Sequence, residues 1–198
     1  MSKTRIWTLW SEKGINEEES KILRSHAREI PVPYDDEARR DIKKLLDAFL
    51  ERDDALGLAA PQIGICKKIV VFKIRGLNEK APVRSENDYE VLINPRITQK
   101  RGEEEKMSEG CLSCPDINVE VTRPREIKVR AHDMKGNRIN KRYTDFLARI
   151  VQHELDHLDG KLIIDHDGTF FIPREKRDFF RKLFVSDSPD AQKKMAHT

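Results

Sequence analysis

Residues 152–157 read Gln152-His153-Glu154-Leu155-Asp156-His157, and the flanking sequence predicts that they lie in a helix. Thr144 is a suitable N-cap before this stretch, and Gly160 is a suitable helix stop after it. Because His153 and His157 are four residues apart, their imidazoles leave the same face of a helix. Between the two ends, apolar residues recur at helical spacing: Phe146, Leu147, Ile150, Val151, Leu155 and Leu158.

Two neutral imidazoles at this spacing can bind one divalent metal ion, and Glu154 can then reach a water on that ion. The H-E-x-x-H spacing is typical of metal-dependent hydrolases. A buried helix that carries three polar side chains needs partners for them, since desolvated polar groups without partners cost free energy. Two histidines are too few for a catalytic site, which uses three protein ligands and one open position.

Three sources of a third ligand compete. A histidine six residues after His157 would suit one class of proteases, but Ile163 stands there and cannot bind a metal. Glu175 is a downstream carboxylate, although it lies in a charged run that resembles a solvated surface. Either Cys111 or Cys114 can complete a Cys-His-His set, for which zinc, ferrous iron, cobalt and nickel are about equally suitable. Both cysteines together would instead form a structural Cys₂His₂ zinc site, although the interval to the first histidine far exceeds the about 12–15 residues usual in a zinc finger.

The composition is typical of a protein with a hydrated, charged surface and a single hydrophobic core. The 198 residues suit a single domain, 37% of them are charged, and the formal net charge is only +3. This balance gives no signal for recognition of a specific nucleic acid sequence. No segment approaches the roughly 18 consecutive apolar residues of a membrane span, and the start lacks a secretory signal. Three cysteines are too few for a disulfide framework, so we expect a cytoplasmic protein.

The order of elements predicts an α+β fold in which antiparallel sheets pack around a central helix that carries H-E-x-x-H. An amphipathic helix is predicted over residues 35–52, a helical turn at 17–23 and a basic helix at 175–184. We expect turns at Gly102 and at Lys135-Gly136-Asn137. The predicted strands are residues 68–74, 91–93, 96–100, 104–107, 119–122, 127–132, 138–143 and 162–164. Residues 1–185 are expected to form one catalytic domain with a core at about 30–165, and residues 186–198 a disordered tail.

Residues 55–64 are small and nearly uncharged in a chain that is otherwise rich in charge. Small side chains allow a close approach of the backbone to another group, and Gln62 is the single side-chain amide of this stretch. Taken alone, the stretch favours a tight turn between a helix and a strand.

Three motifs together resemble those of the peptide deformylase family. They occur in the order Leu58-Ala59-Ala60-Pro61-Gln62, Glu109-Gly110-Cys111-Leu112-Ser113 and then Gln152-His153-Glu154-Leu155-Asp156-His157. Each motif alone is a weak or moderate signal, whereas all three in this order are very specific. The similarity extends over about residues 30–165.

The resemblance implies that Cys111, His153 and His157 hold one divalent metal per chain, with Fe²⁺ as the native ion and Zn²⁺, Ni²⁺ or Co²⁺ as alternatives. It also implies hydrolysis of the N-formyl group from the N-terminal formyl-methionine of nascent polypeptides, with release of formate. Glu154 would act as general base and then general acid. The side-chain N–H of Gln62 and the backbone N–H of Leu112 would stabilise the tetrahedral intermediate.

The resemblance also suggests how substrate binds. Gly57 would let the substrate backbone come close, and Glu109 and Gly110 would border the pocket. The apolar wall for the methionine side chain is assigned to Leu56, Phe146 and Ile150, although core packing explains each of these three equally well. Some family members dock on ribosomes through a basic C-terminal helix, for which this chain offers Arg174, Lys176, Arg177, Arg181 and Lys182. Such a charge run also fits a plain solvated face.

Three residues depart from the family pattern. Ala55 replaces the first glycine of the small-residue motif, so the backbone there must avoid a conformation that only glycine adopts. Cys114 replaces a small aliphatic residue and is expected to be an inert buried thiol rather than an oxidation partner for Cys111. Asn118 stands where some members carry a basic residue near the peptide path. The alternatives to a deformylase are a zinc-dependent endopeptidase and a non-enzymatic protein with a structural Cys₂His₂ site.

Overall fold

The computed structural model describes residues 3–77, 83 and 85–185. The predicted disordered tail, residues 186–198, therefore lies outside the described residues. Within the described ranges, none of the helices is long and apolar enough to cross a membrane.

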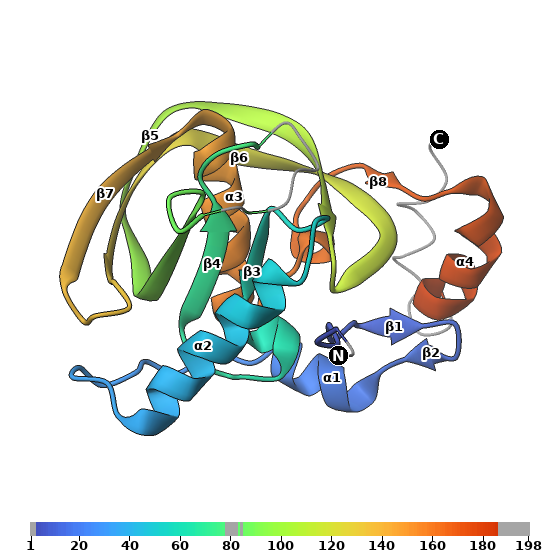
Figure 1. Ribbon diagram of the computed structural model, residues 1–198. Coiled ribbons are helices and arrows are strands. Elements are labelled where there is room, and N and C mark those ends of the chain that lie inside the picture. Colours follow the sequence, from blue (N-terminus) through green and yellow to red (C-terminus); the bar gives the residue numbers. More distant parts are fainter. Residues whose placement is uncertain (1–2, 78–82, 84, 186–198) are drawn as a thin grey trace.

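An antiparallel sheet forms the framework of the α+β fold, with the strand order β3-β4-β5-β6-β7 and with β8 paired to β6 (Figure 1). Its strands are β3 (Gly57–Ala59), β4 (Ile69–Lys73), β5 (Tyr89–Cys111), β6 (Cys114–His132), β7 (Arg138–Thr144) and β8 (Phe170–Phe171). A separate hairpin consists of β1 (Trp10–Ser11) and β2 (Gly14–Ile15). The helices are α1 (Glu17–Leu23), α2 (Asp36–Leu50), α3 (Asp145–Leu158) and α4 (Arg177–Val185), with short 3₁₀ helices η1 (Ala60–Ile63), η2 (Ile163–Asp165) and η3 (Arg174–Lys176).

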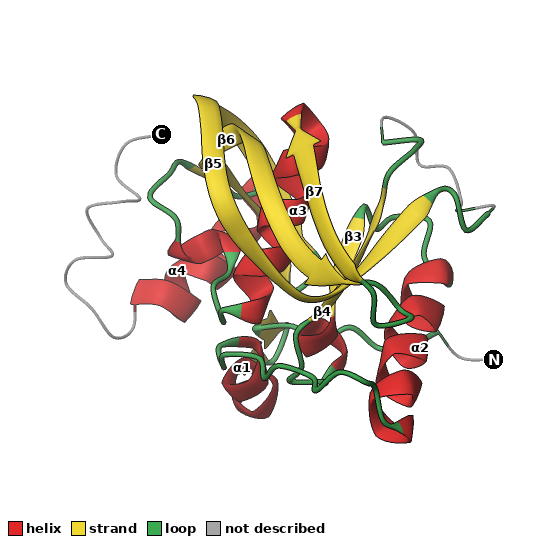
Figure 2. Ribbon diagram, turned by 90° about the vertical axis from the view of Figure 1, so that its left-hand side faces the viewer, coloured by secondary structure: helices red, strands yellow, loops and turns green. Residues whose placement is uncertain are grey.

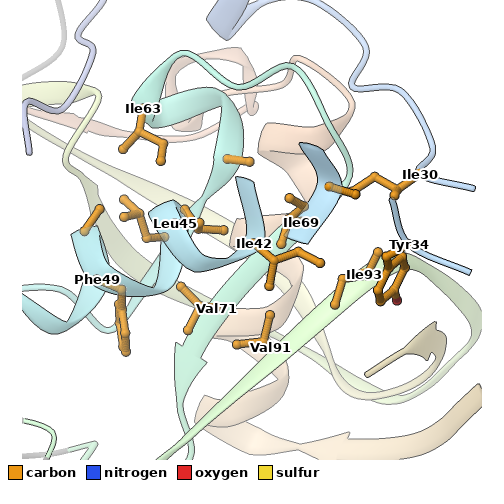
Figure 3. Close-up of a cluster of buried hydrophobic side chains, with 14 of the residues drawn as sticks. Ile30, Tyr34, Ile42, Leu45, Phe49, Ile63, Ile69, Val71, Val91 and Ile93 are labelled. Carbon is orange, nitrogen blue, oxygen red and sulfur yellow. The ribbon is translucent and has the colours of Figure 1, made fainter. Parts of the chain in front are cut away.

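Strand β4 lies between two helices, which explains why its sequence is apolar at nearly every position. Successive side chains of a strand point to opposite faces of the sheet. Ile69 and Val71 accordingly belong to the core cluster that contains α2, whereas Val70 and Phe72 belong to the cluster that contains α3. Figure 3 shows the first of these clusters, with side chains from α2 packed on those of β4 and β5.

Helix α2 forms for the reasons that its sequence predicts. The Asp35 carboxylate accepts a hydrogen bond from the Ala38 N–H at 2.7 Å, and Asp36 and Glu37 lie in the positive first turn. The buried side chains recur at helical spacing and include Ile42, Leu45 and Phe49. The predicted amphipathic helix and the predicted turn at 17–23 are both confirmed.

The third core cluster joins the N-terminal hairpin and helix α4 to the first half of β6. Trp10 from the N-terminal hairpin packs edge-on against Phe180 of α4, with ring centroids 5.4 Å apart. Val119 and Val121 of β6 belong to the same cluster. In both Figure 1 and Figure 2, α4 lies far from α2, and Figure 1 shows β8 on the same side of the molecule as α4. The C-terminal segment is thereby placed beside the β5–β6 hairpin.

Two predicted local elements are wrong. Gly102 does not turn the chain: it adopts φ +76° inside β5, and a register shift between Arg101 and Glu104 absorbs it while β6 pairs on both sides. The predicted strand at 162–164 is instead the 3₁₀ helix η2, in which the Asp165 carboxylate accepts the Leu162 N–H at 2.8 Å. The predicted strands at 119–122 and 127–132 are parts of one continuous strand, β6. The turn at Gly136 is confirmed, with φ +87°.

Candidate active site

Helix α3 packs one face on the sheet and carries the H-E-x-x-H residues on another. Ile150, Val151 and Leu158 are buried in the cluster below it. Thr144 occupies the N-cap position as predicted, although its side chain makes no capping hydrogen bond. After the helix Gly160 adopts φ +70°, and a Cβ there would lie 2.6 Å from the Arg24 carbonyl carbon. A glycine is therefore required where the helix stops.

Cys111 is the last residue of β5, directly before the hairpin turn into β6, where it pairs with Cys114. Its Sγ lies 3.3 Å from Nε2 of His157. One side-chain donor atom from each of Cys111, His153 and His157 lies within 4.8 Å of the other two. A thiolate and two imidazoles at this separation form the three-ligand set that a catalytic metal site requires. These residues therefore fit a single divalent metal.

Glu109 orients His153. Its Oε2 lies 3.0 Å from Nδ1 of His153, so the Nδ1–H donates to the carboxylate and Nε2 remains available as a ligand. Arg123 donates to both Glu109 oxygens, from Nε at 2.7 Å and from Nη2 at 2.9 Å. Burial would raise the pKa of Glu109, but the hydrogen bonds from His153 and Arg123 outweigh it and hold that pKa well below its usual range. Glu109 is thus a charged support for one histidine of the candidate metal site.

Cys114 supports the other end of the cluster. Its thiol donates a hydrogen bond to the Cys111 sulfur, which together with the nearby His157 lowers the pKa of Cys111 despite burial. The same hydrogen bond and burial raise the pKa of Cys114 itself. Cys114 is buried at 1% exposure and is absent from the donor group, so a four-ligand Cys₂His₂ arrangement is not formed among the described residues.

Glu154 is buried and has an unused oxygen. Its Oε2 makes no hydrogen bond within the described part of the chain. Burial raises the pKa of this carboxyl to about 7. Gly57 of β3 makes room for it, since a Cβ at Gly57 would lie 2.7 Å from both Cγ and Cδ of Glu154. A buried carboxyl group with a pKa near neutrality, next to three donors that could hold a metal, is suited to proton transfer.

Gln62 is held in one orientation by two neighbours. Its Oε1 accepts the Ala59 N–H at 2.8 Å, and its Nε2 donates to Ser113 Oγ at 3.2 Å. Nε2 lies 4.0 Å from the Cys111 sulfur, which places the amide at the donor cluster. Nearby, the Leu112 N–H donates no hydrogen bond to any residue that the structure describes. Residues 55–64 thus form β3 and η1, which place this amide, rather than only a tight turn. Ala55 is buried and does not adopt a positive φ, as its identity requires.

One cavity of about 800 Å³ collects nearly all of the residues that the sequence singled out. Its lining includes Leu56, Gly57, Gln62, Glu109, Gly110, Cys111, Leu112, Phe146, Ile150, His153 and Glu154. His157 is not part of the lining and lies behind Cys111. Glu175, the carboxylate considered as a third ligand, is exposed in η3 and outside the donor cluster.

Several parts of the lining were not predicted, and two of them belong to α3 and to β8. Arg149 lies on α3 among apolar neighbours, and an arginine on the buried stripe of a helix was the signal that could have revealed it. The residues of β8 and its continuation, from Phe170 to Pro173, line the cavity because β8 pairs with β6 at Asn118 and Val119. No local sequence pattern indicates such a two-residue strand.

Comparisons with known proteins agree with this geometry. The sequence model of the polypeptide deformylase family matches residues 13–172. Peptide deformylase 1 of Rickettsia conorii is 39% identical over 154 residues, covering 77% of this chain and 83% of the relative. The peptide deformylase of Thermodesulfovibrio yellowstonii is 38% identical over 151 residues, covering 75% and 84%.

Solved structures give the same result. The peptide deformylase of Synechococcus elongatus in complex with actinonin has a TM-score of 0.69 and 30% identity, covering 93% of this chain and 89% of that one. A Met-Ala-Ser-bound class I type b peptide deformylase from Acinetobacter baumannii has a TM-score of 0.66 and 26% identity, covering 82% and 99%. The chain belongs to the polypeptide deformylase family.

Proposed function

We propose that Cys111, His153 and His157 hold the metal with which this deformylase removes the formyl group from the N-terminal formyl-methionine of nascent polypeptides, releasing formate. The observation that carries the assignment is the approach of their donor atoms to within 4.8 Å, beside the Glu154 carboxylate with its unpaired oxygen. Neither the endopeptidase nor the structural-site alternative is supported, given the family and the position of Cys114 outside the donor group.

Fe²⁺ is proposed as the native ion, and Zn²⁺, Ni²⁺ or Co²⁺ as ions that the same donors accept. A divalent metal in this site would polarise the formyl carbonyl and lower the pKa of a water toward neutrality. The hydrogen bond from Cys114 favours the thiolate form of Cys111 that a metal requires. Glu109 fixes the tautomer of His153 for the same purpose.

Glu154 is proposed to move the proton. Its carboxylate takes a proton from the attacking water and later delivers it to the leaving amine, so that formate and a free N-terminus result. A pKa near 7 balances these two tasks, because the group must both gain and lose the proton in one turnover. Burial in the cavity keeps bulk water from competing for that proton.

Two N–H groups are proposed to stabilise the negative charge that develops on the formyl oxygen. Hydrogen bonds with Ala59 and Ser113 fix the Gln62 amide, so it does not have to reorient when the charge appears. The unpaired Leu112 N–H is the second donor. Preorganised donors of this kind typically contribute about 10²–10³ each in rate.

The peptide is proposed to bind between two strand edges. Strand β3 is the last strand of the sheet order, and β5 pairs with β4 only through residues 89–93, so residues 108–110 are paired with β6 alone among the described strands. An extended peptide can add to such edges through main-chain hydrogen bonds. The methionine side chain then enters the apolar part of the cavity at Leu56, Phe146 and Ile150.

Gly57→Ala is expected to lower kcat/KM by at least about 10²-fold without loss of metal. The added Cβ would lie 2.7 Å from Cγ and Cδ of Glu154, so the carboxylate must move away from its working position. Steady-state kinetics and metal analysis on the same sample check this. Activity within twofold of the unmodified protein would show that Gly57 is not needed to seat Glu154.

The reaction assignment is tested by the products. Formyl-Met-Ala-Ser should yield one formate for each free amine, whereas we expect acetyl-Met-Ala-Ser, whose acyl group is larger by one methyl group, to remain intact. Met-Ala-Ser is the peptide bound by the Acinetobacter baumannii relative. Cleavage of an internal peptide bond without formate release would contradict the assignment.

We further propose that residues 1–185 act as one catalytic domain, since side chains from the N-terminal hairpin and from α4 share a core cluster with β6, and that this domain works in the cytoplasm. The basic C-terminal segment is proposed to contact ribosomes. Its charges are partly engaged already, with Lys176 3.3 Å from Asp116 and Arg181 3.3 Å from Asp178. Arg174→Glu together with Lys182→Glu should therefore reduce co-sedimentation with ribosomes while formate release from a tripeptide is unchanged. Unchanged co-sedimentation would exclude this contact.

A further inference from the structure

Arg149 is a buried cation in the wall of the catalytic cavity. It lies on α3 one helical turn before His153, is 5% exposed and lines the same cavity as Phe146 and Ile150. Burial of an arginine is costly unless its N–H groups are paired. The hydrogen bonds that this guanidinium makes inside the protein therefore show which of its N–H groups remain for a ligand.

Three of the five N–H groups of Arg149 are used inside the protein. Nη1 donates to Glu109 Oε1 at 2.7 Å and to the Val121 carbonyl at 2.9 Å, and Nη2 donates to the Glu105 carbonyl. An arginine has five donors, so one N–H on Nε and one on Nη2 are left over. In the described part of the chain neither has a hydrogen-bond partner, and Nε is not sealed from accessible space. Arg149 is one of the residues that line the cavity of the candidate active site.

Several apolar side chains line the same cavity as Arg149. Leu56, Phe146 and Ile150 offer dispersion and hydrophobic contact, which distinguish weakly between side chains of equal length and shape. A methionine side chain differs from its all-carbon isostere, norleucine, by a thioether sulfur, which is polarisable and a weak acceptor. A donor in the wall is the group that can tell the two apart.

We propose that Arg149 is a specificity-determining residue that donates an N–H to the thioether sulfur of the substrate methionine. This inference rests on the proposed function and names what selects the first side chain. When norleucine binds, the same N–H loses access to water and gains no acceptor, which disfavours that substrate. The aliphatic part of the side chain still packs on Phe146 and Ile150.

Arg123 provides the comparison that separates selection from support. It also pairs with Glu109 through two hydrogen bonds and is also 5% exposed, but it does not line the cavity. Loss of either arginine weakens the support of Glu109 and so of His153. A change in side-chain preference, in contrast, is expected from Arg149 alone.

The first test uses the unmodified metal-loaded protein and three substrates of equal length. Formyl-Met-Ala-Ser, its norleucine analogue and its O-methylhomoserine analogue place sulfur, methylene or ether oxygen at the same position. With a donor in the wall, kcat/KM for methionine should exceed that for norleucine by about 5-fold, and the ether should also exceed norleucine. Without a donor the polar ether should be the poorest of the three, and a methionine to norleucine ratio near one would overturn the proposal.

The second test compares Arg149→Met with Arg123→Met. Both variants are expected to lose kcat for all three substrates, but only Arg149→Met should bring the methionine to norleucine ratio close to one. An unchanged ratio in Arg149→Met, or an equal loss of preference in Arg123→Met, would contradict the assignment. Should Arg149→Met fail to fold, the substrate series on the unmodified protein still decides. Failure of the proposed function is distinguishable, because no formate would then be released from any of the three substrates.

Discussion

Glu154→Gln is expected to lower kcat by about 10²–10⁴-fold while about one metal per chain stays bound. The substitution keeps the size of the side chain but removes the group that accepts and returns the proton. Glu154 is not in the donor cluster, so Cys111, His153 and His157 should retain the metal. Steady-state formate release and metal analysis on one preparation measure both quantities.

Glu175→Gln is the matched control for this result. It makes the same chemical change on an exposed residue of η3 that lies outside the donor cluster. Its kcat and metal content should equal those of the unmodified protein. A folded Glu154→Gln variant with full activity would remove this residue from the mechanism, and a variant that lost its metal would make it a ligand or a ligand support instead.

Cys111→Ser and Cys114→Ser are expected to differ sharply although the two residues are only three positions apart. Cys111 contributes one of three donors, so its replacement by a weaker ligand should release the metal on dialysis and abolish formate production. Cys114→Ser keeps a small hydrogen-bonding group beside Cys111 and should hold about one metal per chain.

Dialysis followed by metal analysis distinguishes the two roles directly. Loss of metal from both variants would indicate a four-ligand site in which both thiols bind. Cys66→Ser offers a further control, because Cys66 lies outside the donor cluster and outside the cavity. Its metal content and its rate of formate release should be unchanged.

The features that sequence predicted best are those encoded locally. Helix α3 follows from an apolar spacing with a stop at Gly160, and the two histidines of H-E-x-x-H fall on one face because the helix repeat places them there. Helix α2 likewise carries its own cap at Asp35. The proposed third ligand is not encoded near the two histidines in the sequence. Its spacing left both Cys111 and Cys114 as candidates, and the family resemblance favoured Cys111. Their burial and hydrogen bonding then show why the two thiols differ.

The features that sequence missed depend on pairing across the fold. Gly102 is a residue type typical of turns, but the pairing of β5 with β6 continues past it because a register shift absorbs the extra residues. Strand β8 has two residues and exists because β6 offers an edge at Asn118 and Val119. The sequence shows an arginine, Arg149, on the buried stripe of α3 but not its role. Its hydrogen-bond acceptors belong to Glu109, Val121 and Glu105, which lie on other elements.

The most direct test of the catalytic assignment is the rate of formate release from formyl-Met-Ala-Ser, measured against metal content on anaerobically purified protein. If Cys111, His153 and His157 hold the catalytic metal, the rate should rise in proportion to bound Fe²⁺ and level off at about one ion per chain. Protein stripped of metal should release no formate until Fe²⁺ is restored. Full occupancy without formate release, or equal release by the stripped protein, would contradict the account.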